Sequence, residues 1–168
     1  MNERPLRILL LDSDSQHSAR AARALEEAGF ETYVVEGLQQ WQQVAGRANE
    51  FDVILLDHGF AGLSGLQLLG EMRKQGVHAP VIVLASSGQQ RVAASAVRAG
   101  VAEYLIKEPD FSHLEILPNA VGRVAQAHQE GRLSRPYCSR EEEQLRHLVL
   151  IDPLTSLYNR RFLSEALP

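Results

Sequence analysis

Five short apolar runs alternate with amphipathic segments along most of the chain. The runs occupy residues 7–11, 31–35, 53–56, 80–84 and 102–106. The third run is apolar at every position, which is typical of a strand that a parallel sheet buries on both faces. The intervening segments, at 16–28, 38–45, 64–72 and 89–99, place apolar residues at helical spacing. This alternation predicts an α/β fold with a doubly wound, five-stranded parallel sheet.

A fifth helix and a helical extension are expected after the last strand. Pro118 is disfavoured inside a helix, so we expect a turn over residues 112–117 and a helix from Pro118 to about Gln129. Residues 131–136 have the composition of a hinge, and residues 140–150 predict a C-terminal linker helix. We therefore divide the chain into a domain at 1–130, a hinge and linker helix at 131–151, and a separate piece at 152–168.

Composition argues against several classes of function. The 168 residues carry a formal net charge of −4 and no basic tract, so we expect neither direct nucleic-acid binding nor attraction to an anionic membrane. No apolar run approaches the roughly 20 residues of a membrane span. The one cysteine, Cys138, has no partner for an internal disulfide, which fits a reducing compartment. We expect a cytoplasmic protein.

Charged side chains stand where three of the predicted strands end. Asp12 and Asp14 follow the first strand, Asp57 follows the third and Lys107 follows the fifth. The carboxyl ends of parallel strands share one edge of the sheet, and these three strands can lie side by side. Carboxylates beside a lysine suit Mg²⁺ and a phosphoryl group, and a carboxylate can itself attack phosphorus to form an acyl phosphate. Asp14 or Ser15 can instead cap the helix that follows, which leaves Asp12 for the site.

The segments around these residues resemble the receiver domain of bacterial two-component response regulators, over roughly residues 7–129. The resemblance rests on the stretches ILLLDSD, DVILLDHGFAGLSGLQLL, PVIVLASS and AGVAEYLIK. It implies a flavodoxin-like fold and Mg²⁺ as the cofactor. It also implies a sensor histidine kinase or a phosphotransfer protein as the partner.

The same resemblance implies a role for each matching residue. Asp57 would be the phospho-acceptor, and Lys107 would be the lysine that contacts the phosphoryl group. Asp12 would belong to the acidic pair that holds Mg²⁺, together with Asp57 and the backbone carbonyl of Gly59. Tyr104 occupies the aromatic switch position of the last strand.

The sequence departs from the family pattern at positions that bear on the chemistry. Ser13 stands where a second acid is usual, and Asp14, one position later, is an alternative metal ligand. Ala85 stands where the family has a threonine or serine that contacts the phosphoryl group, and Ser86 is the neighbouring alternative. With one acid fewer, we expect weak Mg²⁺ binding and slow phosphorylation when the ion is scarce.

The C-terminal stretch DPLTSLYNRR, at residues 152–161, carries a second resemblance. It is similar to the opening of GGDEF domains, the diguanylate cyclases, with Ser156 where glycine is usual. No GG[DE]EF signature follows before Pro168, so we expect this chain to hold only the start of such a domain and to have no enzymatic activity of its own. The resemblance implies a piece of a longer protein that makes cyclic di-GMP.

Three functions compete at this stage. The leading one is a receiver whose phosphorylation at Asp57 controls the C-terminal cyclase. The second is a degenerate receiver, never phosphorylated, that serves as a dimerisation or protein-interaction module, and Ser13 and Ala85 support it. The third is a nucleotide- or flavin-binding enzyme of the same architecture, ranked last because the acidic loop after the first strand would repel phosphate. GGDEF domains work in facing pairs and residues 145–149 form an apolar helical stripe, so we expect a homodimer.

Overall fold

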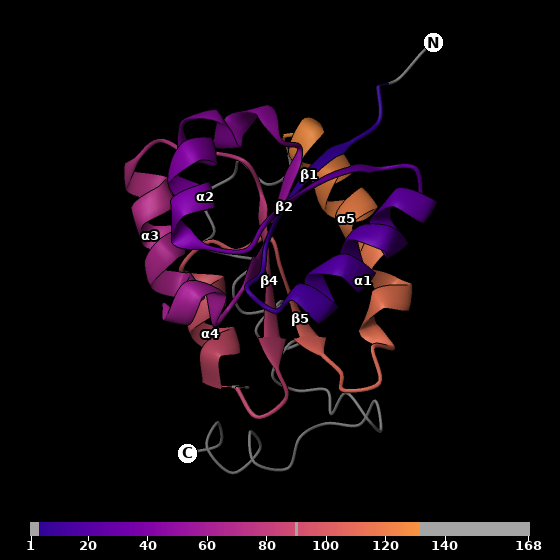
Figure 1. Ribbon diagram of the computed structural model, residues 1–168. Coiled ribbons are helices and arrows are strands. Elements are labelled where there is room, and N and C mark those ends of the chain that lie inside the picture. Colours follow the sequence, from indigo (N-terminus) through magenta and orange to yellow (C-terminus); the bar gives the residue numbers. More distant parts are fainter. Residues whose placement is uncertain (1–3, 90, 132–168) are drawn as a thin grey trace, which may run out of the picture.

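The described part of the chain forms a five-stranded parallel sheet between two layers of helices (Figure 1). The computed structural model describes residues 4–89 and 91–131. The strands are β1 (Arg7–Leu11), β2 (Glu31–Val35), β3 (Val53–Asp57), β4 (Val81–Ser86) and β5 (Glu103–Lys107). The helices are α1 (Ser15–Glu27), α2 (Leu38–Val44), α3 (Gly65–Lys74), α4 (Arg91–Arg98) and α5 (His113–Gln129), with 3₁₀ helices η1 (Ala45–Glu50) and η2 (Phe60–Gly62). The predicted linker helix and the GGDEF-like stretch lie outside the described residues.

The strand order is β2-β1-β3-β4-β5, and every neighbouring pair is parallel. The fold class predicted from the sequence is therefore confirmed. Placing the first, third and fifth strands side by side is right for β1 and β3 and wrong for β5, because β4 lies between β3 and β5. Strand β4 follows β3 after one crossover helix, and sequential strands most often take neighbouring positions.

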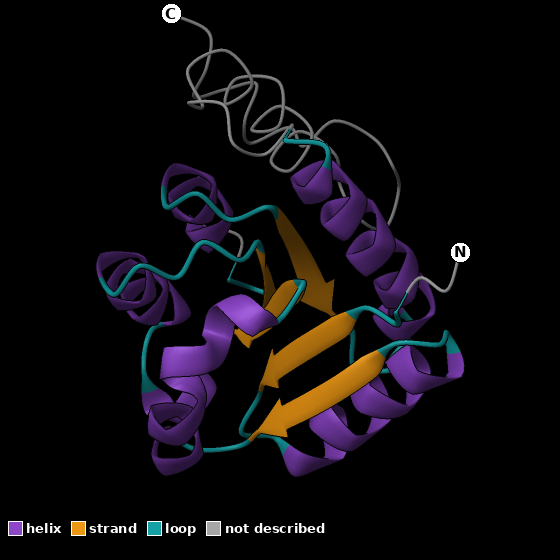
Figure 2. Cartoon of the chain, turned by 90° about the horizontal axis from the view of Figure 1, so that it is seen from above, coloured by secondary structure: helices purple, strands orange, loops and turns teal. Residues whose placement is uncertain are grey.

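Each face of the sheet is covered by its own set of helices. Helices α1 and α5 cover one face, and α2, α3 and α4 cover the other (Figures 1 and 2). Successive strand residues point to opposite faces, so Leu10 packs with α1 and α5 while Leu9 packs with the other layer. Both faces must therefore be apolar, which explains the uninterrupted apolar run in β3. No described helix combines the length and apolarity needed to cross a membrane.

Helix α5 begins earlier than the sequence predicts, whereas the other boundaries lie within two residues of their predicted positions. It runs over His113–Gln129, so Pro118 lies inside the helix and the predicted turn over 112–117 is wrong. The N–H of Leu114 bonds the carbonyl oxygen of Phe111, so the first turn closes ahead of the proline. Leu117 is buried against the sheet, and this packing keeps the turn helical although the following proline disfavours helical geometry at Leu117.

Candidate functional site

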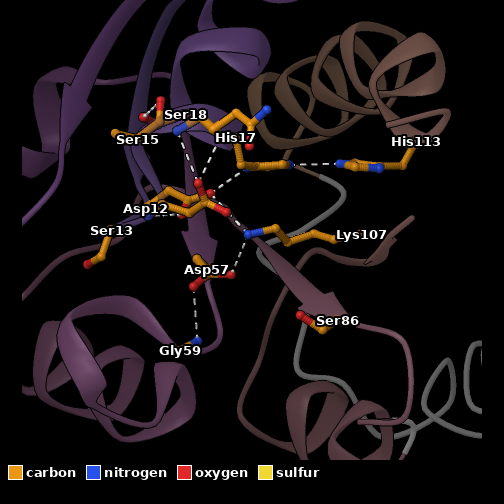
Figure 3. A network of polar contacts seen from close by, with 12 residues as sticks. Asp12, Ser13, Ser15, His17, Ser18, Asp57, Gly59, Ser86, Lys107 and His113 are labelled. Atoms are coloured by element: carbon orange, nitrogen blue, oxygen red, sulfur yellow. Dashed lines mark hydrogen bonds and ion pairs between the residues drawn. The ribbon is translucent and has the colours of Figure 1, made fainter. Parts of the chain in front are cut away.

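Three charged side chains meet at the carboxyl edge of the sheet (Figure 3). Asp12 directly follows β1, Asp57 ends β3 and Lys107 ends β5. The Lys107 ammonium lies 3.1 Å from Asp57 Oδ1 and 3.2 Å from Asp12 Oδ2, so it reaches past the end of β4. The structure thus brings together the three residues that the strand ends indicated. We call Asp12, Asp57 and Lys107 the strand-end cluster.

Asp12 is fully buried, and several donors compensate its charge. Its Oδ1 accepts a hydrogen bond from the Asp14 N–H at 2.9 Å, and its Oδ2 faces both Lys107 Nζ and His17 Nδ1, the latter at 2.5 Å. Burial alone would raise the pKa of Asp12, but the hydrogen bonds from His17 and Asp14 and the charge of Lys107 outweigh it and lower that pKa. Asp12 is therefore an anion in a site closed to water.

Asp57 differs from Asp12 because solvent reaches it. Its side chain is 15% exposed, whereas that of Asp12 is 0% exposed. Asp57 Oδ2 accepts a hydrogen bond from the Gly59 N–H at 3.2 Å. Burial would lower the pKa of Lys107, but the charges of the two carboxylates outweigh it and raise that pKa above its usual value. The site offers one accessible carboxylate beside a fixed positive charge.

Two of the metal ligands predicted from sequence have other contacts in the structure. Asp14 is the N-cap of α1, and its Oδ1 accepts hydrogen bonds from the N–H groups of Gln16 and His17 at 3.0 and 3.1 Å. The carbonyl oxygen of Gly59 accepts a hydrogen bond from the Gly62 N–H at 3.1 Å. Capping uses one carboxylate oxygen of Asp14, while the Gly59 carbonyl keeps a second lone pair.

The end of β4 brings no hydroxyl to the strand-end cluster. Ala85 is fully buried in the core beneath α4. Ser86 is exposed, and among the described residues no hydrogen bond joins its hydroxyl to the cluster (Figure 3). Tyr104 is buried, its hydroxyl donates to the carbonyl oxygen of Gln89 at 3.1 Å, and burial raises its pKa. The predicted switch tyrosine therefore points toward the start of α4.

Comparison with known families accounts for this arrangement. The family description of the response regulator receiver domain matches residues 8–117, a range that holds the whole strand-end cluster. The chain belongs to this family. Receiver domains generally bind Mg²⁺ at their acidic phosphorylation pocket and interact with histidine kinases or phosphotransfer proteins. The resemblance to receivers is therefore confirmed, and the resemblance to GGDEF domains stays a prediction.

The chain is similar to several known response regulators. It is 32% identical over 108 residues to the photosynthetic apparatus regulatory protein RegA of Rhodobacter capsulatus, covering 64% of this chain and 58% of that protein. It is 31% identical over 97 residues to the two-component response regulator PhoP of Pseudomonas aeruginosa, covering 56% and 43%. A solved receiver domain protein from Clostridium thermocellum matches with a TM-score of 0.66 at 26% identity, over 74% of this chain and 97% of that one. The chain thus spans about half the length, or less, of the curated relatives it matches.

The carboxylates of the strand-end cluster suit a small, hard cation that has few protein ligands. Mg²⁺ keeps several waters and is commonly bound through one or two carboxylates. Asp12 and Asp57 can serve as these, whereas Ser13 adds no charge and accepts a hydrogen bond from the Ala61 N–H at 2.8 Å. The described residues contain no group of three or more His, Cys, Asp or Glu side chains suited to a metal. Asp57 is accessible to a hydrated Mg²⁺, whereas Asp12 would have to exchange a contact with Lys107, His17 or the Asp14 N–H to become the second ligand.

Two residues next to the strand-end cluster escaped the sequence analysis. His17 in the first turn of α1 and His113 at the start of α5 are both buried, and His17 bonds Asp12 directly. These histidines are 96 positions apart, so no local spacing reveals them as a pair. The available signal is positional, because each lies in the first turn of a helix that follows a strand ending at the cluster.

Proposed function

We propose that this receiver accepts a phosphoryl group on Asp57 from a histidine kinase or a phosphotransfer protein. The observation that carries the proposal is the asymmetry of the strand-end cluster. Asp57 is accessible and Asp12 is buried, while Lys107 bridges the two at 3.1 and 3.2 Å. An incoming phosphoryl donor can therefore reach Asp57 but not Asp12, and the Lys107 ammonium lies beside Asp57.

The chemistry follows from these positions. An oxygen of Asp57 attacks phosphorus while the bond between phosphorus and the donor's imidazole nitrogen breaks, and the electron pair of that bond returns to the nitrogen. Lys107 stabilises the negative charge on the phosphoryl oxygens. Mg²⁺, when bound by Asp12, Asp57 and the Gly59 carbonyl, supplies further positive charge at those oxygens. Ala85 contributes no hydroxyl to them.

Intact-mass measurement after incubation with Mg²⁺ and acetyl phosphate tests this proposal. We expect the wild type to gain the mass of one phosphoryl group and Asp57→Asn to gain none. Glu71→Gln is the matched control, because Glu71 is an exposed carboxylate that pairs with Lys74 on α3, and it should react like the wild type. An unmodified wild type at saturating donor and Mg²⁺ would contradict the proposal.

A second candidate function is a receiver that binds partners without being phosphorylated. Two observations favour it: Asp12 Oδ2 is already shared by Lys107 and His17, and Ser13 replaces an acid. Ser13→Asp tests whether the missing acid weakens Mg²⁺ binding. If the wild type is an acceptor with one acid too few, the variant should bind Mg²⁺ about tenfold tighter in calorimetry, since a unit charge at a partly exposed site contributes on the order of 1–4 kcal/mol. Unchanged affinity would show that water or Asp14 already fills that position.

We also propose that the receiver regulates a C-terminal diguanylate cyclase in a longer protein. The support is the resemblance of residues 152–161 to the opening of GGDEF domains. Relatives such as the transcriptional regulatory protein ZraR of Escherichia coli carry names that indicate another output. Cyclic di-GMP production from GTP by the longer protein, with and without acetyl phosphate, tests this output. The present chain is expected to produce none.

A further inference from the structure

A chain of buried imidazoles runs from the strand-end cluster to the start of α5 (Figure 3). The buried polar residues of the described part are Asp12, His17, Ser18 and His113, and three of them are connected. His17 Nδ1 lies 2.5 Å from Asp12 Oδ2, and His17 Nε2 lies 2.8 Å from His113 Nε2. Beyond them, His113 Nδ1 accepts a hydrogen bond from the Glu108 N–H at 2.9 Å. We call His17 and His113 the histidine relay.

The directions of these hydrogen bonds fix the protonation of both rings. The Glu108 N–H can only donate, so His113 Nδ1 accepts and the His113 proton lies on Nε2. That proton points at His17 Nε2, which therefore accepts and leaves the His17 proton on Nδ1, facing Asp12. This hydrogen-bond assignment places one proton on each ring. Burial, which lowers the pKa of His113 to about 4, agrees with this assignment.

Phe111 covers the relay from the loop between β5 and α5. Its ring stacks on His17 and His113, with ring centroids 6.2 and 6.4 Å apart. The guanidinium of Arg20, on α1, lies 4.3 Å from the centroid of the Phe111 ring. Phe111 has a φ of 63°, which is unfavourable for a bulky residue and persists only when its surroundings hold it. The loop at residues 108–112 therefore depends on its contacts with the relay and α1.

We propose that the histidine relay positions Asp12 and transmits changes of charge in the strand-end cluster to the loop at residues 108–112. Asp12 Oδ2 is shared between Lys107 and His17. If Lys107 moves toward one carboxylate, the strength of the hydrogen bond between His17 and Asp12 changes. This change passes along the relay, because each hydrogen bond in a chain polarises the next. Phosphorylation of Asp57 is one such change, and only in that respect does the inference rest on the proposed function.

The end of β4 lacks the side chains that could transmit a change from the strand-end cluster toward α4. Ala85 has no hydroxyl that could form a hydrogen bond to a phosphoryl group on Asp57. The Tyr104 hydroxyl already donates to the carbonyl oxygen of Gln89. The histidine relay leads the other way, to α1 and α5 on the opposite face of the sheet. The relay thus gives the cluster a hydrogen-bonded connection to the loop at residues 108–112, and Ala85 offers no side-chain hydrogen bond toward α4.

Asparagine variants cut the relay at a single link. An asparagine amide reaches as far as the Nδ1 position of histidine but no further. His17→Asn keeps a donor for Asp12 and loses the contact with His113, whereas His113→Asn keeps an acceptor for the Glu108 N–H and loses the contact with His17. The two variants cut the same link from opposite sides, so either one serves if the other fails to fold. His78→Asn, at an exposed histidine before β4, is the control.

NMR of the full chain measures the coupling. Asp57→Asn is the first trigger, because it removes one partner charge of Lys107 without any ligand. We expect it to shift the amide resonance of Gly59 in every background, and that of Phe111 only where the relay is intact. The Phe111 shift should be lost with His17→Asn and kept with the control. An equal Phe111 shift with and without His17→Asn, or none in the wild-type background, overturns the relay.

Beryllofluoride with Mg²⁺ is the second trigger, and it separates this inference from the proposed function. The same pattern is expected with the natural Asp57. If this probe leaves Gly59 unshifted, the proposed function is contradicted, while Asp57→Asn still decides the relay. Imidazole ¹⁵N spectra give a direct check: we expect protons on His17 Nδ1 and His113 Nε2, and the opposite tautomers would overturn the relay.

Discussion

Lys107 pairs with both the buried carboxylate of Asp12 and the accessible carboxylate of Asp57. Its charge stabilises Asp12 more, because water cannot solvate a buried carboxylate. In Lys107→Gln, Asp12 stays buried with His17 as a donor but without a cation nearby. We expect the free energy of unfolding to fall by about 2–4 kcal/mol, as when one partner of a buried ion pair is removed. Urea unfolding at neutral pH measures this loss.

Lys74→Gln is the control for that measurement. Lys74 is exposed on α3 and pairs with Glu71 at 2.8 Å, and surface pairs of this kind contribute little to stability. We therefore expect its unfolding midpoint to stay close to that of the wild type. Equal losses in the two lysine variants would mean that the bridge at the strand-end cluster is no stronger than a surface pair.

His113 makes stability depend on pH within a defined window. Burial is the main cause that lowers its pKa from 6.5 to about 4. Between these values the unfolded chain takes up a proton that the folded chain does not, so the free energy of unfolding falls as the pH drops from about 6.5 to about 4. The loss reaches about 3 kcal/mol at most, since each pKa unit corresponds to about 1.4 kcal/mol.

Urea midpoints measured from pH 7.5 to pH 4 test this dependence. His113→Asn should remove that part of the slope, because no imidazole is then left at this position to titrate. The pKa of Asp12 is lowered from 3.8, so its contribution to the free energy of unfolding is lost mainly below the pH range in which His113 titrates. An unchanged slope in His113→Asn would contradict the assignment.

The chemistry of single residues was only partly readable from the sequence. Asp12, Asp57 and Lys107 follow strands, and the shared edge of a parallel sheet is enough to bring strand ends together. His17 and His113 meet because α1 packs against α5, and the chain signals this contact only through their matching positions in the first turns of the two helices. The hydroxyl partner of Tyr104 is set by how the segment before α4 folds.

At the scale of elements, α5 contains a proline in its second turn. Pro118 cannot donate a hydrogen bond to the Leu114 carbonyl, and Pro118→Ala restores that donor. The gain is reduced because proline also restricts the unfolded chain. We expect the free energy of unfolding to rise by about 1–2 kcal/mol, measured by thermal or urea unfolding.

Asn119→Ala, at the exposed neighbouring position, is the matched control for Pro118→Ala. It improves helix propensity without adding a backbone donor, so we expect a gain of about 0.5 kcal/mol. A loss of stability in Pro118→Ala would show that the proline ring itself contributes packing that alanine cannot replace.

Order and type of the elements were predictable, because each strand and helix carries its own apolar period. Two features were not. The place of β4 between β3 and β5 depends on how the crossovers pack, which no single segment encodes. The start of α5 depends on burying Leu117 against the sheet, and this tertiary contact outweighs the local signal of Pro118.

At the scale of the whole molecule, the proposed output requires two copies to meet. Residues 145–149, which lie outside the described part, place apolar side chains at helical spacing, and such a stripe favours association. We expect sedimentation to show stronger self-association of this chain with beryllofluoride and Mg²⁺. A chain ending at Gln129 should lose that response. A strictly monomeric protein in every condition at high concentration would contradict the prediction.

The pairing of β1 with β3 has a consequence for the newly made chain. Synthesis delivers the N-terminal strands first, and the register of Leu11 with Leu56 brings Asp12 and Asp57 to the same edge once β3 has docked. Lys107 is made 50 residues after Asp57, so a nascent chain at that stage has the two carboxylates of the strand-end cluster without its lysine. If Asp57 is the acceptor, as proposed, a chain that lacks β5 holds it without the lysine expected to contact the phosphoryl group. The complete strand-end cluster therefore forms only after β5 has joined the sheet.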